Sequence, residues 1–162
     1  MLPSKTPSLH PNVIAVQQRL EATGSSSQIL LLDEGVHTAA AAAQALGVEV
    51  GQIANSLIFD VSGEPLLVLT SGAHRVDTAK VAADLGVEKL KRATPEFVRE
   101  HTGQPIGGVA PLGHPRPVRT LLDRTLGQYD VIWAAGGVPQ AVFPITYREL
   151  LRITDADEVD VA

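Results

Sequence analysis

The sequence contains no cysteine, which excludes disulfide bonds, thiolate metal sites and a cysteine nucleophile. It also contains no apolar run near the roughly 20 residues that a membrane-spanning helix needs. Residues 1–11 lack the apolar core of a secretory signal peptide. We therefore expect a cytoplasmic protein that does not enter a membrane.

An excess of positive charge is missing as well. The formal net charge at pH 7 is −5. A protein that covers nucleic acid over a wide surface usually carries a basic patch or a strongly basic domain. The negative net charge therefore excludes a general DNA- or RNA-coating function and makes DNA an unexpected partner. It is compatible with a site that holds one or two phosphates.

Common catalytic and metal-binding motifs are absent too. There is no P-loop, no HExxH helix and no GxSxG turn, and the glycines at 103, 107 and 108 do not stand between a strand and a helix as a dinucleotide fingerprint requires. The five histidines are far apart, and no pair has the spacing of metal ligands on one helix face. We expect neither a metal nor another cofactor.

With 162 residues, 44% of them hydrophobic and 19% charged, the chain has the composition of one soluble globular domain. Hydrophobic periodicity and turn residues predict helices at 13–22, 39–46, 76–85, 95–102 and 147–151, and strands at 28–32, 53–60, 65–70, 88–92, 118–122, 129–134 and 141–144. Several strand pairs have only tight turns between them, whereas parallel neighbours need a crossover. The predicted fold class is α/β (α+β), a single domain with a central mixed, mainly antiparallel sheet and surrounding helices.

Two terminal segments are expected to lie outside this domain. Residues 1–11 carry no clear pattern and are predicted to form a flexible arm. Residues 155–162, DADEVDVA, are predicted to be an acidic, frayed tail. The folded domain is therefore expected to span residues 12–154.

The longest stretch without helix or strand character is 102–117, TGQPIGGVAPLGHPRP. A loop of this length inside a compact domain is usually functional or disordered. Alternating glycine and proline favours order, and so do buriable side chains at Ile106, Val109 and Leu112. Gly107 and Gly108 can leave their N–H groups uncovered by side chains, so we expect the backbone of this loop to line a pocket.

A second polar concentration, TSGAHRVD at 70–77, follows a predicted strand and precedes a predicted helix. Exposed N–H groups at such a place can receive an anion, with His74 and Arg75 beside them. The alternative is that Asp77 only caps the helix while both side chains are solvated. The sequence does not decide between these two interpretations.

Three further features have a simple interpretation and a functional one. Asn55 and Ser56 interrupt an apolar strand, and they either bond to backbone or project into a pocket. Lys80 is usually explained as a solvated lysine on a helix. Gly136 and Gly137 are usually explained as a hairpin turn.

In combination these motifs resemble one family. The order and spacing of ALGV at 45–48, QIxxSLIF at 52–59, RVDxxKVA at 75–82, ATPE at 93–96 and TGxPxGGVxPxG at 102–113 are similar to the YbaK/EbsC family. Its members are freestanding relatives of the editing domain inserted in bacterial prolyl-tRNA synthetase. The resemblance covers about residues 13–154.

The resemblance implies a mixed α/β fold with a partly barrel-like sheet. It implies a trans-editing aminoacyl-tRNA deacylase, acting on a small wrong amino acid on tRNA for proline. The acceptor end of aminoacyl-tRNA would be its partner, with prolyl-tRNA synthetase as a second one. The family's GxxxP element corresponds to residues 107–111, which are implied to form the wall of the aminoacyl pocket.

One position departs from the family pattern. Many relatives carry a functional lysine in the strand motif K-[ST]-L, where this chain has Asn55. Lysine supplies a point charge, whereas asparagine supplies neutral hydrogen bonds that are weaker by about half. This difference leaves open a non-catalytic module that binds aminoacyl-tRNA or a synthetase. A hydrolase of small esters or nucleotide-linked acyl groups is a third hypothesis.

An aminoacyl ester is already activated, so a positioned water, or an adjacent ribose hydroxyl of the substrate, could assist its hydrolysis without a catalytic triad. We expect the N–H groups of Gly107, Gly108 and Val109 to stabilise the oxyanion, with Asn55 as a fourth catalytic residue. The remaining candidates for substrate binding are Ser56, Ser71, Gly72, His74, Arg75, Lys80, Pro111, His114 and Gly136. Among these, Arg75 and Lys80 are expected to hold a phosphate, and His74 and His114 are candidate bases.

Overall fold

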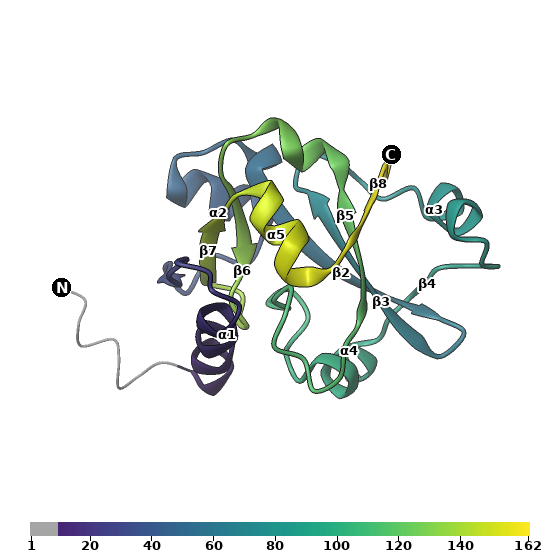
Figure 1. Cartoon of the computed structure of the whole chain (residues 1–162), viewed down its shortest axis with the longest axis horizontal. Coiled ribbons are helices and arrows are strands. Elements are labelled where there is room, and N and C mark those ends of the chain that lie inside the picture. Colours follow the sequence, from purple (N-terminus) through teal and green to yellow (C-terminus); the bar gives the residue numbers. More distant parts are fainter. Residues whose placement is uncertain (1–9) are drawn as a thin grey trace.

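The computed structural model describes residues 10–162 (Figure 1). The predicted N-terminal arm lies outside the described residues, except for the helix cap His10 and the first helical residue Pro11. The helices are α1 (Pro11–Ala22), α2 (Ala39–Leu46), α3 (Thr78–Leu85), α4 (Pro95–Thr102) and α5 (Tyr147–Thr154), with short 3₁₀ turns η2 (Val50–Gln52) and η3 (Arg124–Gln128). The strands are β1 (Leu30–Leu31), β2 (Ile53–Val61), β3 (Glu64–Ser71), β4 (Lys91–Arg92), β5 (Arg119–Asp123), β6 (Ile132–Ala135), β7 (Ala141–Ile145) and β8 (Asp157–Val159).

All eight strands belong to one mixed sheet in the order β1-β7-β6-β2-β3-β5-β8, with β4 paired to β2 beside this path. The pairs β1–β7, β6–β7, β2–β3 and β2–β4 are antiparallel, whereas β2–β6, β3–β5 and β5–β8 are parallel. The predicted fold class is confirmed. The expected barrel-like character is not, because no pairing within residues 10–162 joins β1 to β8 and the sheet stays open.

Local signals set the ends of α2 and α4 where the sequence predicted them, whereas α1 begins two residues earlier, α3 two residues later and α5 ends three residues later than predicted. The hydroxyl of Thr38 accepts the N–H of Ala41 at the start of α2, and Thr94 does the same for Phe97 at the start of α4. These bonds satisfy N–H groups that the first helical turn leaves unpaired. Gly47 and Gly103 end the same two helices in the left-handed conformation, which glycine adopts without steric cost.

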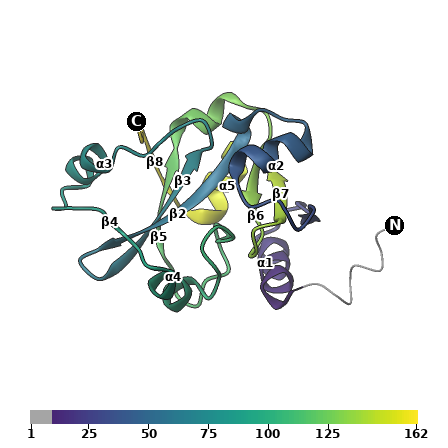
Figure 2. The ribbon, with the colours of Figure 1, turned by 180° about the vertical axis from the view of Figure 1, so that it is seen from behind.

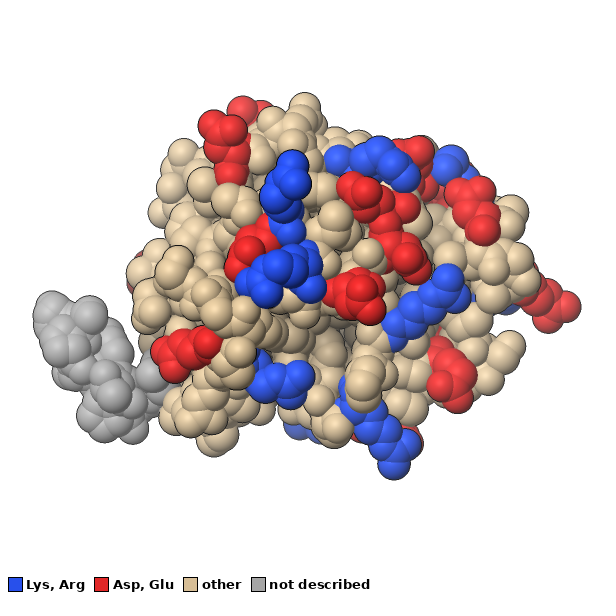
Figure 3. Space-filling model, viewed as in Figure 1, with Lys and Arg blue, Asp and Glu red and all other residues tan. Residues whose placement is uncertain are grey.

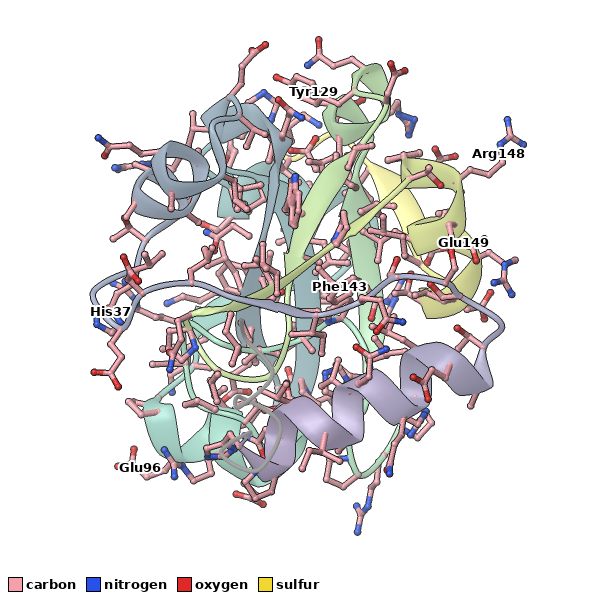
Figure 4. The ribbon with its side chains drawn as sticks, turned by 90° about the vertical axis from the view of Figure 1, so that its left-hand side faces the viewer. His37, Glu96, Tyr129, Phe143, Arg148 and Glu149 are labelled. Carbon is pink, nitrogen blue, oxygen red and sulfur yellow. The ribbon has the colours of Figure 1, made fainter. Side chains whose placement is uncertain are left out.

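The sheet carries helices on both faces, as Figures 1 and 2 show from opposite sides. Ala54 and Ile58 of β2 point into the main core, together with buried residues of α1, α4 and α5. Phe59 and Val61 point to the other face, where they pack with α3. Ile53 also points to that face and packs with α2. Figure 4 shows Phe143 inside the main core, where it is fully buried.

The C-terminal segment corrects one prediction. Instead of fraying, residues 157–159 form β8, which pairs with Leu121–Asp123 of β5. Val161 is 0% exposed and belongs to the core cluster under α3. The acidic residues dominate this segment's composition, but alternation lets Val159 and Val161 face the core while their neighbours face water.

The outer edge of β2 is paired at both ends and open in the middle. Strand β6 pairs with Ile53 and Ala54, and β4 pairs with Phe59 and Asp60. Between them, residues 55–58 have no strand partner on this edge within the described chain. This interruption positions the candidate site. No helix of residues 10–162 combines the length and apolar character that crossing a membrane requires.

Candidate functional site

A cavity of about 870 Å³ opens at the unpaired stretch of β2. Residues 55–59 form its floor, and the cavity extends past the strand edge on both sides. The main-core side is lined by Ala93, Val98, Ile106, Gly107 and Val109, and the opposite side by Arg75, Val76, Thr78, Leu90 and Arg92. The structure thus brings together five predicted site residues: Asn55, Ser56, Arg75, Gly107 and Val109.

The glycine-rich loop lines this cavity, but its N–H groups are not equivalent. Gly107 adopts φ +87°, a conformation that favours glycine. The N–H of Gly108 donates to the carbonyl of Pro105 at 3.0 Å, and that of Ala110 donates to Gln104 Oε1 at 2.6 Å. Within residues 10–162 the N–H groups of Gly107 and Val109 have no such acceptor. Of the three N–H donors that the sequence predicted, those of Gly107 and Val109 therefore remain free.

Gly108 is needed for packing instead. A β-carbon built on it would lie 2.6 Å from Val138 Cα, which is closer than real contacts allow. The loop is thus pressed against the turn between β6 and β7. Val109 and Leu112 are buried as expected, whereas Ile106 is 56% exposed and stands at the cavity rim.

Ala110 is the point at which this loop is fixed. Its N–H is bound by Gln104, which is only 3% exposed, and its carbonyl accepts a hydrogen bond from His114 Nε2 at 2.8 Å. Burial lowers the pKa of the His114 imidazole below its ordinary value; the bond to Ala110 opposes this shift, and Arg19 adds to it. His114 therefore acts as a neutral brace.

Asn55 and Ser56 lie side by side on β2 but on opposite faces of the sheet, because successive strand side chains alternate. Ser56 shares its face with Ala54 and Ile58, and its Oγ is buried without a hydrogen-bond partner among the described residues. Asn55 shares its face with Phe59 and with the arginine side of the cavity. A buried hydroxyl without a partner is uncommon and costs about 1–3 kcal/mol.

Arg75 and Arg92 are the charged residues that line the cavity. Both are exposed, and neither forms an ion pair with any described residue. Elsewhere basic and acidic side chains are interspersed, as Figure 3 shows for one face of the molecule. The cavity is thus a local positive site on a protein of net charge −5.

Several predicted residues near the end of β3 have structural positions instead. Ser71 is buried, and its Oγ donates to the carbonyl of Gly51 at 2.8 Å. Gly72 passes so close to η2 that a β-carbon would lie 2.5 Å from the Val50 oxygen. His74 Nδ1 lies 2.9 Å from Oδ2 of the buried Asp123. Asp77 caps α3, as its simple interpretation predicted.

The structure also places four other candidates away from the cavity. Lys80 Nζ donates to Asp84 on the same helix and to the Asp160 carbonyl in the C-terminal segment. Pro111 and His114 line a separate, smaller cavity on the far side of the loop. Gly136 is buried in the β6–β7 turn, where its N–H donates to the Ala141 carbonyl.

Sequence reasoning missed Arg92, Ile106, the apolar residues Leu90 and Ala93 that flank β4, and Val98 of α4. The tripeptide Lys91-Arg92-Ala93 gave one usable signal, because strand alternation puts Arg92 and Ala93 on opposite faces. Which face meets the cavity depends on the pairing of Arg92 with Phe59, which no local pattern indicates.

Comparison with known proteins agrees with this geometry. The family model for the aminoacyl-tRNA editing domain matches residues 33–153. The structure of a candidate trans-editing enzyme for prolyl tRNA synthetase superposes with a TM-score of 0.90 and 44% identity, covering 94% of this chain and 98% of that one. The chain belongs to the aminoacyl-tRNA editing domain family, as the motif resemblance implied.

Two curated relatives extend the comparison. Protein YwhH of Bacillus subtilis (strain 168) is 32% identical over 110 residues, which are 67% of this chain and 69% of YwhH. The proline–tRNA ligase of Nitratidesulfovibrio vulgaris (strain DP4) is 33% identical over 102 residues. That match covers 63% of this chain and 18% of the ligase, so the chain corresponds to one segment of a much longer enzyme.

Proposed function

We propose that the protein is a trans-editing deacylase that hydrolyses the ester of a mischarged tRNA, with a small amino acid on tRNA for proline as its substrate. The observation that supports this proposal best is the pair of N–H groups of Gly107 and Val109 at a cavity in a chain of the editing-domain family. The similarity to a proline–tRNA ligase and to a candidate trans-editing enzyme for prolyl tRNA synthetase supports the choice of tRNA.

The proposed chemistry is ester hydrolysis. A water adds to the ester carbon and gives up its proton to solvent, with the neighbouring ribose hydroxyl able to position this water, and the carbonyl oxygen becomes an oxyanion facing the loop. The N–H groups of Gly107 and Val109 donate to this oxygen, and one such donor is worth about 3–4 kcal/mol in comparable sites. The ester bond then breaks, and the departing ribose oxygen takes up a proton from solvent.

The residues of the cavity supply orientation and no proton transfer near neutral pH. Apart from the two arginines, its lining within residues 10–162 holds no Asp, Glu, His, Lys or Tyr. The Ser56 hydroxyl, which has no partner in the folded chain, is placed to bond the amino group or side chain of the amino acid. Val109, Val98 and Ile58 limit the size of the side chain that fits.

A second candidate is a binding module that holds charged tRNA without cutting it. Asn55 favours this alternative, because the cavity floor carries a neutral amide where many relatives place a lysine. Saturable binding of charged tRNA without release of amino acid would support it, and so would a gain of turnover in Asn55→Lys.

The test is release of labelled amino acid from a panel of tRNAs charged with alanine, cysteine, serine or threonine. Gly107→Val should lower the rate about 100-fold or more, because the new side chain covers the loop N–H groups. Gly24→Val is a matched control, since Gly24 has φ +88°, open space around it and a position outside the cavity. No release from any tRNA in the panel would overturn the proposal, and equal rates in both variants would remove the loop from the mechanism.

A further inference from the structure

We propose that Arg75 and Arg92 form a phosphate clamp on one side of β2, so that the substrate straddles the strand edge with its phosphate on the arginine side and its ester on the loop side. This inference rests on the proposed function for the identity of the substrate. The clamp itself follows from the charge and placement of the two arginines.

The two arginines reach the same face of the sheet from different elements. Arg92 is directly opposite Phe59 in the antiparallel β2–β4 pair, so the two side chains share a face. Arg75 belongs to the loop after β3, which leaves the sheet where Ser71 pairs with Ala54. The arginines therefore flank residues 55–58 from the two ends of the unpaired stretch, and both line the same cavity.

Both positions are held by the fold. Arg92 lies in a strand pair, and Arg75 follows His74, whose ring contacts the buried carboxylate of Asp123. That carboxylate also accepts the N–H of Ser71 at 2.9 Å. On the other side of Arg75, the N–H of Asp77 donates to the Val161 carbonyl at 2.7 Å. A loop fixed at both ends loses little further entropy when its arginine binds a ligand.

The chemistry of the lining selects an anion. The two guanidinium groups are unpaired among the described residues, and no carboxylate lines the cavity with them. Guanidinium binds phosphate through two parallel hydrogen bonds, which makes arginine the preferred partner for such groups. Because the protein as a whole is acidic, a nucleic acid gains little attraction from the rest of its surface.

The geometry assigns opposite sides to the two ends of the substrate. Gly107 and Val109, whose N–H groups have no acceptor among residues 10–162, line the main-core side, whereas Arg75 and Arg92 line the opposite side. A terminal nucleotide esterified with an amino acid has its acyl group and its 5′-phosphate on opposite sides of the ribose. Such a molecule fits across residues 56–58, with its sugar at the strand edge.

Binding of a stable analogue tests the clamp without turnover. The probe is an adenosine carrying alanine in amide linkage at its 3′ position, prepared with and without a 5′-phosphate. In the natural chain the phosphate should tighten binding about tenfold or more. That gain should disappear in Arg75→Gln/Arg92→Gln and be smaller but still present in Arg75→Lys/Arg92→Lys, which keep the charge and lose the paired hydrogen bonds. Arg148→Gln is the control, because Arg148 is exposed and projects away from α5 in Figure 4.

The salt dependence of the affinity for uncharged tRNA gives an independent test of the clamp. Each lost phosphate contact should make the slope of log affinity against log salt less negative by about 0.7. The clamp would be overturned if the 5′-phosphate of the analogue added nothing to its affinity, or if the arginine variants kept the salt slope of the natural chain. Either result would do so even if deacylation is observed. Conversely, a phosphate gain that depends on the arginines in a chain without deacylase activity would support the clamp and reject the proposed reaction.

Discussion

His114 Nε2 lies 2.8 Å from the carbonyl oxygen of Ala110, and this contact holds the cavity loop from behind. The neutral ring donates to the carbonyl, since a carbonyl can only accept. Burial keeps the pKa of this imidazole below its ordinary value of 6.5. The contact therefore links the position of the loop to the protonation of a residue outside the substrate cavity.

This linkage predicts a pH dependence of stability. As the pH falls, a histidine whose pKa is lowered by folding takes up its proton in the unfolded chain before it does so in the folded one. Its contribution to the free energy of unfolding is therefore complete above pH 6.5 and decreases as the pH falls toward the pKa of the folded state. His114→Gln should unfold more easily at pH 7.5 but lose less stability between pH 7.5 and 5.5. Urea unfolding at both pH values measures this difference. The natural chain and His114→Gln share all other histidines. An equal loss of stability in both between pH 7.5 and 5.5 would therefore contradict a role of His114 in this pH dependence.

Gly108 should tolerate no side chain although its backbone is unstrained. In Gly108→Ala the new carbon meets the backbone of Val138 and Pro139, neither of which can move without displacing the β6–β7 turn. We expect a loss of about 1–3 kcal/mol in the free energy of unfolding. Gly35→Ala provides the comparison, since a β-carbon there meets open space and φ is not in the left-handed region. A neutral Gly108→Ala would show that the loop does not press against this turn.

Ser56 should show opposite effects on stability and activity. Its Oγ is buried without a partner, so Ser56→Ala removes an unsatisfied polar group and should be neutral or stabilising by about 1 kcal/mol. If the hydroxyl binds the substrate, the same change should lower kcat/KM on mischarged tRNA. Thermal unfolding and deacylation assays on one preparation separate the two effects. A variant that is clearly less stable would mean that the hydroxyl has an internal partner.

The lining of the cavity predicts an unusual pH–rate profile. Since its described residues include no group that titrates near neutrality, the attacking oxygen must lose its proton to solvent. The logarithm of kcat/KM should rise by about one unit per pH unit from 6 to 8, without an inflection near 6.5. A bell-shaped profile, or an inflection that disappears in His74→Gln, would instead assign a base to the protein.

The last residues should matter for stability. Val161→Ala removes two buried methyl groups from the core under α3 and should cost about 2 kcal/mol. Val159 in β8 is only partly buried, so Val159→Ala should cost less. Urea midpoints for the two variants make the comparison. Equal and negligible costs would indicate that the segment frays, as composition alone suggested.

The sequence by itself determined the elements that local chemistry controls. Thr38 and Gly47 set the ends of α2, and Thr94, Pro95 and Gly103 set those of α4, because caps and left-handed termini depend on neighbouring residues only. The hairpin at Gly63, the irregular loop of 102–117 and the family motifs could be identified in the same way.

Only the tertiary structure decided which residues meet at the site. The pairing of β2 with β6 at one end and with β4 at the other leaves residues 55–58 open, and no local pattern indicates such non-local pairing. That pairing brings Arg92 into the cavity. Packing on the other side of the loop places His114 where it holds the Ala110 carbonyl. Packing also gives Gly108 its role, since the close approach of Val138 leaves no room for a side chain there. Residues separated along the chain become neighbours through strand register and packing, which only the folded chain specifies.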